Sequence, residues 1–269
     1  MRKNVTKLKA NEPDYGNWVS MRGLYTLGAL AIFFLILSFV FLAGLAAAAA
    51  SLVAAAFFVA LGYNTFMRYT FSPRGGNLEA QIREMVLDHF DWDGEGQALD
   101  IGCGNGPLTI AVAKKFPKAR VTGIDYWGGT IFKNEYSRAY SKQACERNAQ
   151  IEGVADRVTF QRASARALPF DDESFDAAVS NFVFYLVDAR DKRDVIKESL
   201  RVVKKGGAFA FHDPFLSKRV YGNFDDLLQT IRSWGVSRVE FVDTSGADFI
   251  PAVLRTPFMR CIGIIYGRK

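Results

Sequence analysis

The chain has 269 residues, 49% of them hydrophobic and 23% charged, with a net charge of +6. This length and composition fit one large globular domain, or one domain with an appendage. Two histidines, His89 and His212, are too few for a His-rich metal centre. The three cysteines lie far apart without a CxxC spacing, which suggests neither a disulfide framework nor a zinc site.

Residues 1–22 form a basic N-terminal segment. Its cations, five in residues 1–23, outnumber Glu12 and Asp14. A basic tail could bind nucleic acid or an anionic membrane surface. The apolar run that follows favours the membrane, and we expect this segment to be cytoplasmic.

Residues 23–67 contain no Asp, Glu, Lys or Arg. One membrane span needs about 20 apolar residues, so this run predicts two transmembrane helices with a tight turn near Ala43-Gly44 or within residues 46–51. Cations at both flanks place both ends in the cytoplasm, which predicts a protein of a prokaryotic plasma membrane. A single span, a re-entrant segment, a cleaved signal peptide and a buried soluble hairpin are the alternatives.

Residues 68–77 are a polar linker, and a second domain is expected over residues 78–269. Asn77 is expected to cap a helix that continues towards Phe90. Apolar runs then alternate with helical stretches, which predicts parallel βαβ units. The expected strands are residues 98–101, 121–125, 158–162, 177–180 and 208–212, followed by a last pair near residues 239–242 and 261–266.

Two of the expected helices have clear boundaries. One covers residues 192–203 and is expected to end at Lys204-Lys205-Gly206-Gly207, where cations oppose the negative helix end and glycine permits a left-handed cap. The other covers residues 225–234.

A glycine-rich turn, Gly102-Cys103-Gly104-Asn105-Gly106, follows the first strand. Glycines let a backbone pass close to a ligand. A dinucleotide-binding domain has the spacing GxGxxG, whereas this turn has GxGxG, with Asp100 before it. That carboxylate disfavours a pyrophosphate and suits a ligand with a sulfonium and an ammonium group. Asp125 ends the second strand, where an acid can accept hydrogen bonds from ribose hydroxyls.

The turn and Asp125 together resemble motif I and its partner acid in the class I methyltransferases that use S-adenosylmethionine (SAM). The resemblance implies an α/β fold with a Rossmann-like seven-stranded sheet, strand order 3-2-1-4-5-7-6 and an antiparallel last strand. It implies SAM as cofactor, S-adenosylhomocysteine as product, and no metal. The implied cofactor-binding residues are Asp100, Gly102, Cys103, Gly104, Asn105, Gly106, Asp125, Tyr126, Ser164, Ala165 and Asn181.

The resemblance also implies roles for two short segments. Ser164 stands where family members often have an Asp that meets the adenine amino group, and the amide of Ala165 is the second expected adenine contact. Residues 126–129 could form a local lid near the cofactor.

The expected catalytic residues are His212, Asp213 and Tyr185, which follow the fifth and fourth strands. Ligands of open α/β sheets bind beyond the carboxyl ends of the strands. His212 could deprotonate an acceptor or be a hydrogen-bonded structural histidine. Phe182, Phe184 and Tyr185 could line an apolar acceptor pocket, although at least one of them must pack in the core.

The segment Leu168-Pro169-Phe170 and the stretches after it resemble methyltransferases of the small-molecule, quinone or lipid type. The first hypothesis is a membrane-anchored SAM-dependent methyltransferase with a small lipophilic or membrane-proximal acceptor and no nucleic-acid partner. A tethered protein or nucleic-acid methyltransferase is the second, and a non-catalytic SAM-binding membrane module the third. An Asn/Asp-Pro-Pro-Tyr/Phe tetrad is missing after strand four, and Arg and Lys are dispersed, which disfavours nucleic acid.

Overall fold

The computed structural model describes residues 11–128 and 140–269. The chain divides into two compact units. The helical unit comprises residues 17–80, and the sheet unit comprises residues 81–269 together with the residues before 17. Residues 11–16 of the basic segment therefore belong with the sheet unit, and the helical unit is inserted between two parts of it in the sequence.

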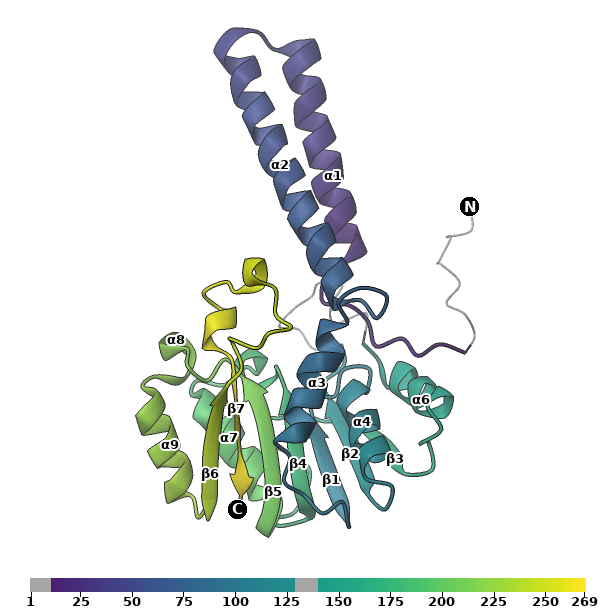
Figure 1. Ribbon diagram of the computed structural model, residues 1–269, viewed down its shortest axis with the longest axis vertical. Coiled ribbons are helices and arrows are strands. Elements are labelled where there is room, and N and C mark those ends of the chain that lie inside the picture. The colour runs from purple at the N-terminus through teal and green to yellow at the C-terminus, as the bar shows by residue number, and fades with distance from the viewer. Residues whose placement is uncertain (1–10, 129–139) are drawn as a thin grey trace. The chain divides into compact units, whose positions relative to one another are not determined.

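The helical unit contains two long apolar helices, which Figure 1 shows side by side. α1 (Met21–Ile36) continues as a π-helical stretch, η1 (Leu37–Phe41), and α2 runs over Gly44–Phe71. The turn at residues 42–43 agrees with the first of the two predicted positions. Gly44 has a φ of 57°, a conformation that glycine adopts at little cost.

Hydrogen bonds join the two helices beside the turn. The hydroxyls of Ser38 and Ser51 are 2.6 Å apart, and the Ser38 hydroxyl also donates to the carbonyl of Ala47. Both helices are long and apolar enough to cross a membrane by length and composition. α2 extends four residues beyond the predicted apolar region, into the expected linker.

The start of the next helix differs from the prediction. α3 covers Leu78–Asp88, and Asn77 before it has a φ of 50°. An N-cap residue normally has an extended backbone, so Asn77 lies in a left-handed turn where an ordinary cap was expected.

The sheet unit is built on one seven-stranded sheet with the order β3-β2-β1-β4-β5-β7-β6, as predicted. β7 is antiparallel to both of its neighbours, and the other pairs are parallel. The strands are β1 (Gln97–Ile101), β2 (Arg120–Asp125), β3 (Val158–Arg162), β4 (Phe175–Asn181), β5 (Val203–Asp213), β6 (Arg238–Asp243) and β7 (Gly263–Arg268).

Helices cover both faces of this sheet (Figure 1). One apolar cluster joins the sheet to α7 (Lys192–Arg201) and α9 (Phe224–Ser233), and the other joins it to α3, α4 (Pro107–Lys115) and α6 (Lys142–Ile151). Neighbouring residues of β1 show this division: Ala98 packs in the second cluster and Leu99 in the first. Burial on both faces explains why the parallel strands are continuous apolar runs.

The observed starts of two strands, β5 and β7, differ from the predictions. α7 ends at Arg201, and residues 203–207 belong to β5. Lys204 pairs with Asp176 at 2.7 Å, and Gly206 and Gly207 exchange backbone hydrogen bonds with Lys269. The prediction of a helix cap at 204–207 is wrong, because these residues form the first part of β5. Likewise Cys261 lies in a 3-10 turn, η4 (Met259–Cys261), before β7.

Candidate active site

The turn after β1 is held by its own backbone and by the end of β2. The amides of Gly102 and Cys103 both donate to the carbonyl of Ile124 at 2.8 Å. The Asp125 carboxylate accepts a hydrogen bond from the amide of Gly104 at 2.9 Å. The structure thus brings the predicted glycine turn and the predicted acid together, although Gly104 and Asp125 are 21 positions apart in the sequence.

Gly102 is required by a close approach as well as by its φ of 78°. A Cβ at this position would lie 2.2 Å from a methyl group of Val183, which is in the loop after β4. Two real carbon atoms do not approach this closely, so only glycine fits. The contact also shows that the turn after β1 and the loop after β4 are neighbours.

Asp125 and Asp100 have different surroundings. Burial raises the pKa of Asp125 to about 6, while the amides of Gly104 and Tyr126 oppose the shift. Asp100 is 1% exposed, and one of its oxygens accepts a hydrogen bond from the Thr109 hydroxyl at 2.6 Å. Burial raises the pKa of Asp100 to about 7. Asp100 therefore braces the turn from inside the domain, through a threonine on α4 that the sequence did not single out.

Asn105 joins three segments through its side chain. Its Nδ2 donates to the carbonyl of Asp14 at 3.2 Å, and its Oδ1 accepts from the amide of Ser141 at 3.1 Å. Asn148 on α6, fully buried, donates to the carbonyls of Asp14 and Asn105 and accepts from the amide of Asp14. Residues 11–16 thus form a strap beside the glycine turn, which no local sequence pattern indicated.

Further side chains close around the carbonyl of Gly104. It accepts hydrogen bonds from the indole of Trp127 at 2.8 Å and from the thiol of Cys145 at 3.1 Å. Cys103 is buried, and burial raises the pKa of its thiol. Tyr126 is 56% exposed, with the guanidinium of Arg162 5.0 Å from its ring centre. The predicted lid includes Gly129, which lies outside the described residues.

The turn after β3 lies next to Asp125, whose carbonyl accepts a hydrogen bond from the amide of Ala163. The Ser164 hydroxyl accepts from the amide of Arg166 at 3.2 Å, so this side chain stabilises its own turn. Ala165 is buried. The adenine contacts of Ser164 and Ala165 stay predictions.

At the ends of β4 and β5, Asn181 and His212 are paired in register. The Oδ1 of Asn181 is 2.8 Å from His212 Nδ1, and the Thr244 hydroxyl is 2.9 Å from His212 Nε2. His212 is fully buried, and burial lowers its pKa to about 3. This neutral, doubly paired imidazole has the features of a structural histidine, and its role as a base stays a prediction. Thr244 follows β6, and the sequence did not indicate it.

Asp213 anchors the turn that contains Tyr185. Its carboxylate accepts a hydrogen bond from the amide of Phe184 at 2.8 Å, and burial raises its pKa to about 7. Burial and the charge of Asp213 raise the pKa of Tyr185 to about 12. Tyr185 therefore stays protonated at neutral pH.

Three aromatic rings meet at this edge of the sheet. Phe182, which has a φ of 57°, is 6.5 Å from Tyr185 and 6.4 Å from Phe258 between ring centres. Tyr185 and Phe258 are 5.3 Å apart. Phe184 is fully buried in the core, so it is the ring for which plain packing holds. The left-handed backbone of Phe182 is strained for a bulky residue and indicates a position constrained by its surroundings.

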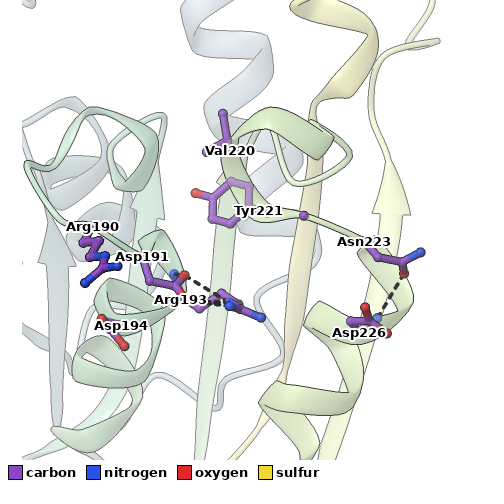
Figure 2. A pocket seen from close by; sticks show the side chains of 9 residues that line it. Arg190, Asp191, Arg193, Asp194, Val220, Tyr221, Asn223 and Asp226 are labelled. Atoms are coloured by element: carbon purple, nitrogen blue, oxygen red, sulfur yellow. Dashed lines mark hydrogen bonds and ion pairs between the residues drawn. The ribbon is translucent and has the colours of Figure 1, made fainter.

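A separate hollow of about 470 Å³ lies between α7 and the segment of α8 (Lys218–Tyr221) and α9. Figure 2 shows Tyr221 within it, between the Asp191–Arg193 pair on one side and Asn223 with Asp226 on the other. No residue of the glycine turn lines it. Two of its charged groups satisfy each other, since Arg193 pairs with Asp191 at 2.6 Å.

Comparison with known proteins identifies a family for the part of the chain that contains the glycine turn and Asp125. Residues 99–211, from β1 to β5, match the family described as a methyltransferase domain. Residues 99–211 are a methyltransferase domain, and the sheet unit has the class I SAM-dependent methyltransferase fold.

Two curated relatives show the level of similarity. The methyltransferase GfsG of Streptomyces halstedii is 28% identical over 151 residues, which are 56% of this chain and 48% of that protein. The ubiquinone/menaquinone biosynthesis C-methyltransferase UbiE of Geobacter sulfurreducens is 27% identical over 162 residues, 57% of this chain and 58% of that protein. The chain thus spans about half the length of these relatives.

Among solved structures, the geranyl diphosphate C-methyltransferase from Streptomyces coelicolor superposes with a TM-score of 0.53 at 16% sequence identity. The superposition covers 71% of this chain and 79% of that one. At this identity the likeness concerns the fold.

Proposed function

We propose that this protein transfers a methyl group from SAM to a small lipophilic acceptor at a membrane surface. The observation that carries the proposal is the glycine turn closed on the Asp125 carboxylate at the carboxyl edge of the sheet. Ligands of open α/β sheets bind at this edge.

The residues of this edge fit SAM. Gly104 has a φ of 58°, which glycine adopts at little cost, and the ring of Tyr140 lies 3.6 Å from the position of its missing Cβ. Asp125 would hold the ribose hydroxyls, Ser164 and the amide of Ala165 the adenine, and Asn181 the amino-acid part. SAM would supply a methyl group on a sulfonium, which is transferred by direct displacement.

Such a reaction depends chiefly on positioning, which can supply about 7–11 kcal/mol of the barrier. His212 holds the Asn181 amide on one side, and Asp213 holds the turn of Phe184 on the other. In this proposal His212 and Asp213 act through these two segments, and Tyr185 contacts the acceptor. The proposal thus gives a role to each of the three predicted residues. His212 and Asp213 position neighbouring segments, and the protonated Tyr185 contacts the acceptor.

The acceptor class is inferred from the aromatic rings of Phe182, Tyr185 and Phe258. Rings of this kind favour flat or apolar molecules. The relative named for ubiquinone/menaquinone biosynthesis supports the same class, since these quinones are small lipophilic molecules.

The membrane part of the proposal rests on the helical unit. In the most apolar 18-residue stretch of each helix, only 17% (α1 with η1) and 11% (α2) of the stretch is buried. Core helices of a soluble protein are mostly buried. Phe39 is 78% exposed and Leu45 91% exposed. A bilayer would cover these side chains, and the flanking cations favour a cytoplasmic sheet unit.

The test uses the detergent-purified chain, radiolabelled SAM, and the lipid and aqueous extracts of the source cell. We expect label in the lipid extract and SAM binding by calorimetry. Label in macromolecules would instead support a protein or nucleic-acid methyltransferase. SAM binding without turnover on any extract would support a non-catalytic module, and failure to bind SAM would refute the proposal.

A further inference from the structure

The connection between β6 and β7, residues 244–262, lies at the carboxyl edge of the sheet. Asp213 at the end of β5 and Asp243 at the end of β6 are both paired with Gly263, where β7 begins. The connection therefore starts and ends at the edge that holds the candidate site. Figure 1 shows it, in yellow, at the same end of the sheet as α8.

Some apolar side chains of the connection are buried in the sheet unit, and others are exposed to solvent. Ile250 and Leu254 are buried at 1% exposure each. Val253, by contrast, is 57% exposed and Phe258 42% exposed. A loop that buries some of its apolar side chains and presents others to solvent has the form of a contact surface.

Cations accompany these exposed apolar side chains. Lys218 and Arg219 on α8 and Arg260 on the connection are exposed, and among the described residues none of the three forms an ion pair with a carboxylate. The amide of Leu216 donates to the carbonyl of Cys261 at 3.0 Å, which joins the segment of α8 to the connection. Residues 214–224 and 249–261 contain no Asp or Glu.

We propose that Val253, Phe258, Lys218, Arg219 and Arg260 form a membrane-contact surface of the sheet unit that meets an anionic bilayer. The two apolar side chains enter the interfacial region, and the three cations lie at the lipid phosphates. This proposal rests on the membrane anchoring in the proposed function, since a tethered unit meets the bilayer at a high effective concentration.

An anionic bilayer is the partner that both features fit. Nucleic acid would use the cations and leave Val253 without a role, because phosphate contacts dominate such binding. Phe258 belongs to the aromatic group beside Tyr185 as well as to this surface. A lipophilic acceptor would therefore reach the site from the bilayer without crossing water.

The experiment places an environment-sensitive fluorophore on the full chain, reconstituted in vesicles with brominated acyl chains. The probe is attached through Ala252→Cys, with Ala155→Cys as the matched control before β3, at the opposite edge of the sheet. Both are made in a Cys261→Ser background, since Cys103 and Cys145 are buried. Vesicles are phosphatidylcholine alone or with about one quarter phosphatidylglycerol.

In vesicles with phosphatidylglycerol, we expect the probe at position 252 to be quenched at least threefold more than the probe at position 155. Arg219→Glu should lower that quenching at least twofold, and Val253→Asp should lower it in the same way. Lys205→Glu, an equal charge change at the opposite edge, should leave it unchanged. Thermal unfolding checks that each variant is folded.

Equal quenching at positions 252 and 155 would overturn the proposal, and so would quenching that is indifferent to phosphatidylglycerol and to Arg219→Glu. Binding of an acidic protein or of nucleic acid to this surface, with no quenching by lipid, would also overturn it. Methyl transfer is measured separately in detergent. Quenching without turnover would refute only the catalytic function, and turnover without quenching would refute only the contact surface.

Discussion

Asp125 has the most direct link between residue and expected function. Its carboxylate holds the glycine turn through the amide of Gly104 and is placed to accept the ribose hydroxyls. We expect Asp125→Ala to weaken SAM binding more than tenfold, or about 1.4 kcal/mol, in calorimetry. Asp156→Ala, an exposed acid before β3, is the control and should bind as the parent does. An unchanged affinity for Asp125→Ala would show that the ribose assignment is wrong.

Asp100 should make the stability of the ligand-free protein depend on pH. Burial raises its pKa from the ordinary 3.8 to about 7, so the folded state binds the proton more tightly than the unfolded state. The contribution of Asp100 to the free energy of unfolding is fully present below pH 3.8. It is lost as the pH rises towards 7.

We therefore expect the melting temperature of the parent chain to fall between pH 5 and pH 7.5, and Asp100→Asn to flatten this dependence. Asp156→Asn should leave the slope of the parent unchanged. The measurement is thermal unfolding in one detergent across a pH series at constant ionic strength. A slope that is the same in Asp100→Asn and in the parent would contradict the assignment.

The strap of residues 11–16 is the element that ties the start of the described chain to the cofactor turn. Asn148 makes two hydrogen bonds to Asp14 of the strap and one to the carbonyl of Asn105 in the glycine turn. Asn148→Ala removes all three hydrogen bonds. The carbonyl of Asn105 is the buried partner among them, and an unsatisfied buried polar group costs roughly 1–3 kcal/mol.

We expect Asn148→Ala to lower the free energy of unfolding of the sheet unit by roughly 1–3 kcal/mol and to weaken SAM binding. Gln143→Ala, exposed on the same helix, should change stability by about 0.5 kcal/mol or less. Urea unfolding followed by tryptophan fluorescence measures both variants. If they were equally stable, the strap would have no part in holding the turn.

For the molecule as a whole, the proposed membrane location rests on the helical unit. We expect the full chain to stay with membranes during alkaline carbonate extraction, because about 20 apolar residues per helix favour insertion. A deletion of residues 21–71 should move the protein to the soluble fraction. Release of the full chain by carbonate would refute the transmembrane interpretation.

The sequence by itself determined the parallel sheet, the helical pair and the glycine turn. Alternating apolar runs and helical stretches predicted the parallel sheet, and a charge-free run predicted the helical pair. These features are local, because strand burial, glycine spacing and apolar length are all recorded in neighbouring residues. The same locality explains the prediction of the turn near Ala43-Gly44.

The tertiary structure decided which side chains support the site. His212 is paired with Thr244 across 32 positions, and Asn148 with Asp14 across 134. It also drew residues 203–207 into β5, although their lysines and glycines suit a helix end. Such contacts join residues that are far apart in the chain, and they leave no periodic pattern in the sequence. They become visible only in the folded protein, because the sheet brings the ends of its strands to one edge.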